Sequence, residues 1–199
     1  MSPVRISRRT LTLALLASPA LAFPGRLAAA QDATPGAGAD RYVSEQFGYQ
    51  ITWPDTWTLV TTDSEEGGFD LVQLTRDDAT AYIVISRPGD TPLSQIAEIM
   101  AGGPDEETFV PGMIATDEEG NEIIGETPDR AWGAWNGNLA GEIVDGFTQF
   151  RYGEVRRLEE DLAVGLSIAM PATSFDRDIA PYSALLEGVT KLGGTPVAD

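Results

Sequence analysis

Two acidic triplets are the residues whose type and spacing could hold a cation. They are Asp105-Glu106-Glu107 and Asp117-Glu118-Glu119, and carboxylate oxygens are ligands that calcium prefers. In the helix-loop-helix calcium pattern the sixth position needs glycine and the twelfth needs glutamate. Counting from Asp117, these positions hold Glu122 and Pro128. We therefore predict solvated acidic loops, and calcium binding is the alternative.

An aromatic pair, Trp132 and Trp135, is the second candidate site. Both stand in a run rich in glycine and asparagine, which predicts a flexible segment. Exposed aromatic side chains in such segments often anchor a protein partner. We predict that both rings are buried as lids over a sheet, and partner binding is the alternative.

The chain contains no cysteine and no histidine. Disulfides, thiolate nucleophiles and zinc fingers are thereby excluded, and so are catalytic triads that need histidine. Ser167 in Gly165-Leu166-Ser167 is therefore not a nucleophile and fits a strand instead. A catalytic pair of carboxylates stays open, although spacing alone does not locate one. We predict a protein that is not an enzyme and needs no cofactor.

Length and charge set the class of partner. The chain has 199 residues and a formal net charge of −18, enough for one ordinary domain once a leader is set aside. Nucleic acids and anionic membrane surfaces are poor partners because their charge has the same sign. A cation, or a protein with a basic face, fits this charge better.

The first thirty residues have the pattern of a signal peptide. A basic head with Arg5, Arg8 and Arg9 precedes a short apolar core, and small residues lead up to a cleavage site after Ala30. Such a core is too short to span a bilayer well, so we expect no stable membrane span in the mature chain. A retained anchor is the alternative.

The basic head also suggests the export route. Ser7-Arg8-Arg9-Thr10-Leu11 resembles a twin-arginine export signal, with general secretion as the alternative. Either route predicts a periplasmic, cell-surface or extracellular protein. Residues 31–40 are predicted to be a flexible linker because they lack large apolar side chains. Residues 193–199 are predicted to be a disordered tail.

The domain at 41–192 begins with its clearest structural signal. Tyr49, Ile51 and Trp53 alternate with polar residues, which predicts a strand with one buried face. Pro54-Asp55 predicts a turn, and Trp57 opens the next strand. Because tryptophan has a large apolar surface, this pair is expected to form part of the core.

Alternation predicts most of the remaining elements as strands. The strand at 162–170 has one face of small residues that would let a helix approach closely, and the apolar strand at 81–85 is expected to be covered on both faces. Apolar stripes at helical spacing predict helices at 91–100 and 175–189, the second preceded by a capping box at Thr173 and Asp176. Division of the second helix into two pieces at Pro181 is the alternative. This order predicts the α+β class, an antiparallel sheet with packed helices. Further strands are expected at 42–43, 69–74, 109–114, 139–144 and 147–155, with a charged turn at 156–161.

The opening stretch resembles that of PsbP-like domains. Gly48-Tyr49-Gln50-Ile51-Thr52-Trp53-Pro54-Asp55-Thr56-Trp57 carries the resemblance, with support from Phe150-Arg151-Tyr152, the strand at 162–170 and the apolar residues Leu185, Leu186 and Val189. It covers most of 42–192. The resemblance implies an α/β/α sandwich with helices on both faces of the sheet.

The resemblance also implies a role. Family members include accessory proteins of photosystem II, assembly factors and exported bacterial domains, and none shares catalytic residues that could be matched here. We therefore predict an exported binding or accessory module acting on another envelope or secreted protein. The alternative is a protein that binds a small ligand or a divalent cation.

Overall fold

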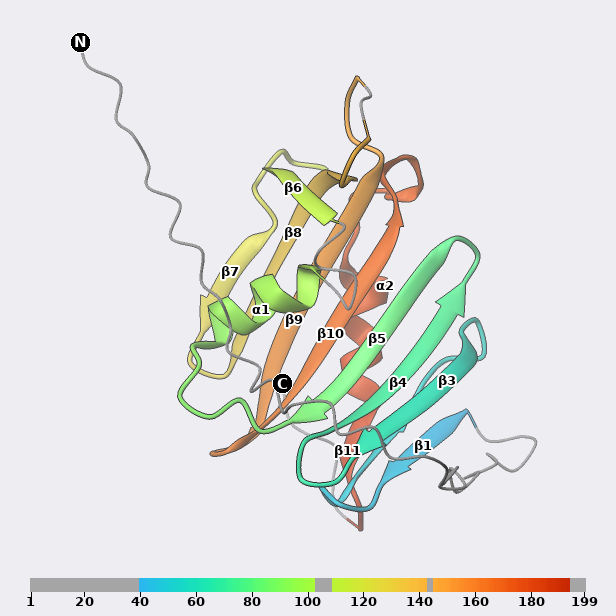
Figure 1. Cartoon of the computed structure of the whole chain (residues 1–199), viewed down its shortest axis with the longest axis vertical. Helices are drawn as coiled ribbons and strands as arrows, with labels where there is room; N and C mark the ends of the chain where they lie inside the picture. Colours follow the sequence, from blue (N-terminus) through green and yellow to red (C-terminus); the bar gives the residue numbers. More distant parts are fainter. Residues whose placement is uncertain (1–39, 103–108, 143–144, 194–199) are drawn as a thin grey trace, which may run out of the picture. The chain divides into compact units, whose positions relative to one another are not determined.

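The computed structural model describes residues 40–102, 109–142 and 145–193 (Figure 1). The predicted signal peptide with Arg8, Arg9 and the cleavage site after Ala30 lies outside these residues. So do the linker before Asp40 and the tail after Gly193. The acidic triplet at 105–107 lies outside them as well.

A small antiparallel sheet contains the strand predicted first. Its order is β1 (Arg41–Ser44), β2 (Tyr49–Thr52) and β11 (Val189–Lys191). Tyr49 and Ile51 are buried, as the alternation predicts. The Trp57 amide donates to the Pro54 carbonyl at 2.9 Å, which closes the predicted turn. Both tryptophans of this stretch, Trp53 and Trp57, belong to the core.

The large sheet contains the other eight described strands, and every pairing in it is antiparallel. This confirms the predicted antiparallel sheet. The order is β3-β4-β5-β10-β9-β8-β6, and β7 also pairs with β8. The bounds are β3 (Thr58–Glu65), β4 (Phe69–Arg76), β5 (Ala79–Ser86), β6 (Phe109–Ile114), β7 (Ile124–Thr127), β8 (Arg130–Leu139), β9 (Gln149–Glu159) and β10 (Leu162–Pro171).

One face of the large sheet carries most of the core. Aliphatic side chains from β4, β5 and β10 alternate inward and are fully buried, among them Val72, Leu74, Ile83, Ile85, Leu166 and Ile168. The alternate positions of β5, such as Tyr82 and Val84, are only half-buried. The expectation that β5 is covered on both faces is therefore wrong, although the strand is central.

Helix α1 (Leu93–Gly102) packs on β8, β9 and β10 (Figure 1). Glycines on the sheet permit this approach: a Cβ atom at position 153 would lie 2.0 Å from the Ala97 carbonyl oxygen, and one at 165 would lie 2.9 Å from the Met100 sulfur. The predicted small face of the strand at 162–170 therefore receives a helix. Any larger residue at position 153 would force the helix backbone to move.

The predicted closing helix at 175–189 is wrong over most of its length. Helix α2 (Ala180–Ser183) is flanked by two 3₁₀ turns, η1 (Ala172–Ser174) and η2 (Ala184–Gly188). Arg177 has a left-handed φ of 68° before the helix, and Val189 pairs with Ile51 in a strand. The predicted capping box is absent, since η1 has no side-chain cap within the described chain.

Two further boundaries differ from the sequence prediction. The strand β9 runs to Glu159, so the predicted charged turn begins only at 160. The predicted strand at 139–144 is wrong at 140–142, where Gly141 turns the chain with a φ of 90°. Positions 143–144 lie outside the described residues.

Across 40–102, 109–142 and 145–193, no helix has the length and apolarity needed to cross a membrane.

Candidate functional site

The predicted aromatic pair lies in a strand, and the expectation of a flexible run is wrong. Trp132 and Trp135 are both half-buried in β8, three residues apart, so their side chains leave opposite faces. Each ring covers a glycine: a Cβ at Gly125 would lie 2.3 Å from the Trp132 ring, and one at Gly133 would lie 2.2 Å from the Trp135 ring. The glycines therefore make room for indoles instead of making the chain flexible.

A buried carboxylate lies beside this pair. Glu154 on β9 is fully buried, and its Oε1 lies 2.7 Å from Arg130 Nε and 2.7 Å from Arg156 Nε. The Tyr152 hydroxyl donates to Glu154 Oε2 at 2.5 Å. Two cations and a phenol thus compensate one buried charge, which would otherwise be very costly.

The two arginines connect this carboxylate to α2 and to Trp132. Arg130 and Arg156 both donate to Ser183 Oγ, at 3.2 Å and 2.9 Å. The Arg130 guanidinium also lies over the Trp132 ring, 4.6 Å from its centroid. The Arg130 Nε faces Glu154 at ion-pair distance without the alignment of a hydrogen bond. Glu154 therefore holds the arginine that covers one face of the indole.

This cluster does not resemble an acid-base site. Both carboxylate oxygens of Glu154 already contact donors from Arg130, Arg156 and Tyr152. A fully buried carboxylate in such contacts has no open side on which a substrate could bind. We interpret the cluster as a structural support for the surface around Trp132.

The phenol of Tyr152 gives the cluster a measurable pH dependence. Burial raises its pKa, and the adjacent Glu154 charge raises it further. The pKa of this phenol in the folded state is above its unfolded value of about 10. The neutral phenol therefore makes its full contribution to folding stability below about pH 10. That contribution decreases as the pH rises from about 10 toward the folded pKa.

Tyr152→Phe is therefore expected to flatten the fall in melting temperature above about pH 10. At neutral pH the variant should be less stable by roughly 1–3 kcal/mol, since Glu154 Oε2 loses a donor. Thermal melts from pH 7 to pH 11 measure both effects. Part of the fall in melting temperature at alkaline pH should remain in the variant, because burial also raises the pKa of Tyr42, Tyr49 and Tyr182. An unchanged alkaline slope would contradict this assignment.

An exposed apolar surface borders the site at the sheet edge. Val110 and Met113 on β6 are 54% and 57% exposed, and they pair with Asn138 and Asn136 of β8. The Phe147 ring packs on Gly112, where a Cβ would lie 2.2 Å from the ring. We name Val110, Met113 and Phe147 the β6 apolar patch.

The backbone of β6 explains why this edge stays open. Pro111 has no amide hydrogen to donate, and the register shifts between Pro111 and Met113. A proline and a bulge on an edge strand are devices that discourage uncontrolled strand pairing. The patch therefore offers side chains rather than a regular free backbone edge.

Acidic residues follow β6 along the chain. From 109 to 129 the sequence contains no lysine or arginine. The carboxylates in this segment are Asp117, Glu118, Glu119, Glu122, Glu126 and Asp129. An apolar patch followed in the sequence by an acidic segment favours a partner that has apolar and basic side chains together.

The acidic turn that could have bound calcium is engaged with its own backbone. The Asn121 amide donates to Asp117 Oδ1 at 2.8 Å, and the Asn121 side chain donates to Oδ2 at 3.1 Å. These hydrogen bonds lower the Asp117 pKa, and the side-chain bond is the largest cause. Within the described ranges no group of three or more potential metal-binding side chains is found.

Comparison with known proteins gives a weak structural similarity. No family model and no curated protein matches this chain. The chain is similar to the solution structure of cyanobacterial PsbP (CyanoP) from Synechocystis sp. PCC 6803, with a TM-score of 0.48 and 11% identity. The match covers 78% of this chain and 95% of that one. A similarity of this size carries no conclusion about function, and membership of the PsbP-like family stays a prediction.

Proposed function

We propose that this chain is an exported PsbP-like domain, with the α/β/α sandwich of that family, that binds another envelope or secreted protein without catalysing a reaction. The observation that carries the proposal is the β6 apolar patch. Apolar side chains gathered on a surface favour association because binding removes them from water. The predicted export signal at Arg8 and Arg9 supports the location, and the resemblance of residues 48–57 supports the family.

The partner is expected to combine apolar side chains with lysine or arginine. Val110, Met113 and Phe147 would be covered by the apolar side chains, and the carboxylates between 117 and 129 would attract the basic ones. Trp132 would extend the contact area, since its ring is half-buried and held by Arg130. This arrangement combines an aromatic side chain with apolar and charged ones, as protein interfaces commonly do.

Replacing two residues of the patch with serine is expected to weaken the complex. In the double variant Val110→Ser/Met113→Ser, the loss of two apolar contacts of about 1 kcal/mol each predicts a Kd at least about 10-fold higher. The partner is first identified by a photo-crosslinking residue at position 113 in the native envelope. It is then purified and titrated against both chains by calorimetry.

Val60→Ser is the matched control, because Val60 is 52% exposed on β3 at the other end of the sheet order. It should leave the Kd unchanged. Equal weakening by both variants, or crosslinks at position 60 and none at 113, would contradict the proposal. A rise in melting temperature on adding calcium would favour the alternative of a cation-binding protein, since a ligand of the folded state stabilises it.

A further inference from the structure

The sheet face that carries α1 is covered by a helix over only part of its width. α1 packs on β8, β9 and β10, and Figure 1 shows no described helix in front of β4 and β5. Val84 of β5 pairs with Gly165, which lies under α1, and Leu71 of β4 pairs with Val84, so all three lie on this face. Phe69 and Tyr82, two residues before Leu71 and Val84, lie on it as well. We name the half-buried side chains Phe69, Leu71, Tyr82 and Val84 the open sheet face.

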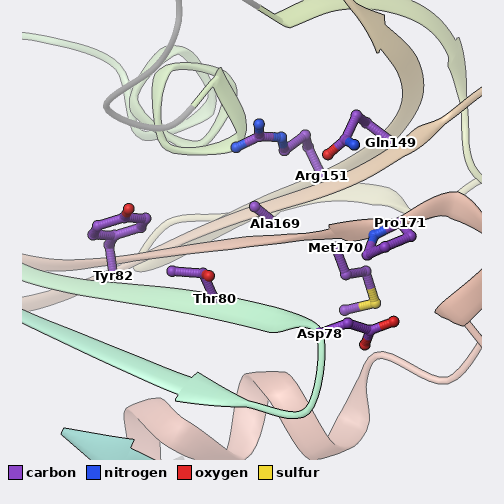
Figure 2. Close-up of a pocket in the computed structure, with 8 residues that line it drawn as sticks. All are labelled: Asp78, Thr80, Tyr82, Gln149, Arg151, Ala169, Met170 and Pro171. Carbon is purple, nitrogen blue, oxygen red and sulfur yellow. The ribbon is translucent and has the colours of Figure 1, made fainter. Parts of the chain in front are cut away.

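Figure 2 shows where the apolar part of this face ends. Tyr82 and Thr80 leave the sheet on the same side as Arg151, and Met170 leaves it on the opposite side. Thr80 pairs with Ala169, which pairs with Arg151, and the pocket at this row is lined mostly by polar side chains. The apolar surface therefore extends from the row of Tyr82 toward Phe69.

α1 turns an apolar flank toward the open sheet face. Ile96, Ile99 and Met100 are three and four residues apart, so they form one stripe along the helix. A Cβ at Gly165 of β10 would lie 2.9 Å from the Met100 sulfur, which places this stripe on the side of the helix toward β10 and β5. Ile99 is 38% exposed, and the other two are half-buried. We name these three residues the α1 flank.

The strand spacing leaves room for one more helix beside α1. Neighbouring strands lie about 4.8 Å apart, and β5 is two strands from β9, the strand on which α1 is centred. A helix over β5 would therefore have its axis about 10 Å from that of α1, within the range of about 8–10 Å for packed helices. Such a helix would contact the α1 flank and the open sheet face together.

Carboxylates lie along the outer border of the open sheet face. In the strand register, Asp63 of β3 pairs with Leu71, and Glu65 pairs with Phe69, so both acidic side chains lie on this face. Both are exposed. The sequence from 42 to 75 contains no lysine or arginine. This border therefore favours a basic group on whatever covers the face.

The arginines at the ends of β4 and β5 are engaged elsewhere. The Arg76 guanidinium lies 4.8 Å from the centroid of the Trp57 ring, which belongs to the core. Arg87 Nε lies 3.2 Å from Asp161 Oδ2. Neither contact involves the carboxylates of Asp63 or Glu65, so the charge of the border is available to a partner.

We propose that the open sheet face binds an amphipathic α-helix of a partner protein, with lysine or arginine along one flank of that helix. Its apolar side lies on Leu71 and Val84 and against the α1 flank. Its basic flank faces Asp63 and Glu65. This surface is separate from the β6 apolar patch, and the inference does not depend on that patch.

The observations favour a partner protein over this chain itself as the source of the helix. A second copy would bring two chains of net charge −18 together, and like charges oppose such an association. The segments 31–39, 103–108, 143–144 and 194–199 contain too few large apolar residues to supply an apolar helical stripe.

A synthetic peptide of about 18 residues tests the proposal, since shorter helices are marginal in water. It consists of leucine, alanine and lysine, with leucines at helical spacing on one side and lysines along one flank. Titration of the labelled peptide with the purified chain, followed by fluorescence anisotropy, should give a Kd of about 10 μM. Amide shifts in NMR should change at 69–71, 82–84 and 96–100. Replacing the leucines with serine, or the lysines with glutamate, should raise the Kd at least about 10-fold.

Two double variants locate the binding surface. Leu71→Thr/Val84→Thr keeps residues that favour strands and should raise the peptide Kd at least about 10-fold, because it removes apolar contacts. Asp63→Asn/Glu65→Gln should raise the Kd about threefold and reduce its dependence on salt. Both residues of this second variant are exposed, so it tests the proposal even if the first variant fails to fold.

Two control variants separate this surface from the edge at β6. Glu118→Gln/Glu119→Gln removes the same charge from an exposed turn, and Val110→Ser/Met113→Ser alters the β6 apolar patch. Both should leave the peptide Kd unchanged. Equal weakening by the two charge variants, NMR shifts confined to β6, or equal binding of the serine peptide would overturn the proposal. Self-association of the chain through Leu71 and Val84 would overturn the choice of a partner protein.

Discussion

Glu154→Ala is expected to destabilise the chain by about 3–5 kcal/mol, the cost of removing one partner from a buried ion pair. The substitution leaves the Arg130 and Arg156 guanidinium groups without the carboxylate that both face at 2.7 Å. It also leaves the buried Tyr152 hydroxyl without its acceptor. For a chain of this size, thermal melting should show a fall in Tm on the order of 10 °C.

Glu159→Ala is the matched control for this experiment. Glu159 lies on the same strand and pairs with Lys191 at 2.6 Å, but both side chains are exposed. Exposed ion pairs contribute little because water and salt screen them, so the Tm shift should be far smaller than that of Glu154→Ala. Comparable shifts for the two variants would show that the Glu154 cluster is not a support of the fold.

Gly153→Ala is expected to have the second largest effect. The added Cβ would lie 2.0 Å from the Ala97 carbonyl oxygen and 2.5 Å from the Ala101 amide nitrogen. Both are backbone atoms, which cannot rotate away as a side chain can. The helix must therefore shift as a unit, which costs about 3 kcal/mol, the upper end for overpacking.

Gly68→Ala controls for the change of glycine to alanine itself. Its Cβ would meet only the flexible Glu65 side chain, at 3.2 Å, and a surface change of this kind is usually within about 0.5 kcal/mol of neutral. Denaturant unfolding of both variants gives the comparison. If Gly153→Ala were as stable as Gly68→Ala, the close packing of α1 on β9 would be wrong.

Alternation predicted β2 and β10 well because a large apolar side chain recurs at every second residue along them. Tyr49 and Ile51 in β2, and Leu166 and Ile168 in β10, follow the two-residue period and are fully buried or nearly so. The closing helix was misread because Tyr182, Leu185 and Leu186 have helical spacing that the short helix α2 and the 3₁₀ turn η2 also satisfy. Pairing of Val189 with Ile51 overrides that local preference.

The candidate site was harder to predict than the fold. Trp132 lies over Gly125, seven residues earlier, only because β7 and β8 form a hairpin. Gly133 makes room for the Trp135 ring, although it stands in the run that was predicted to be flexible. Glu154 did leave a signal: it stands two residues after Tyr152 and therefore on the same buried face. A charged side chain on a buried face predicts that another side chain pairs with it. The sequence pattern does not identify that side chain, because Arg130 comes from another strand and Ser183 from α2.

The central claim is that the chain binds a protein through the edge at β6. Hydrogen–deuterium exchange of the purified chain, with and without the crosslinked partner, tests it most directly because exchange reports protection by segment. The account predicts slower exchange at 109–114 and 124–135 on binding, and unchanged exchange at 58–65 in β3. Protection at β3 without any change at β6 would contradict it.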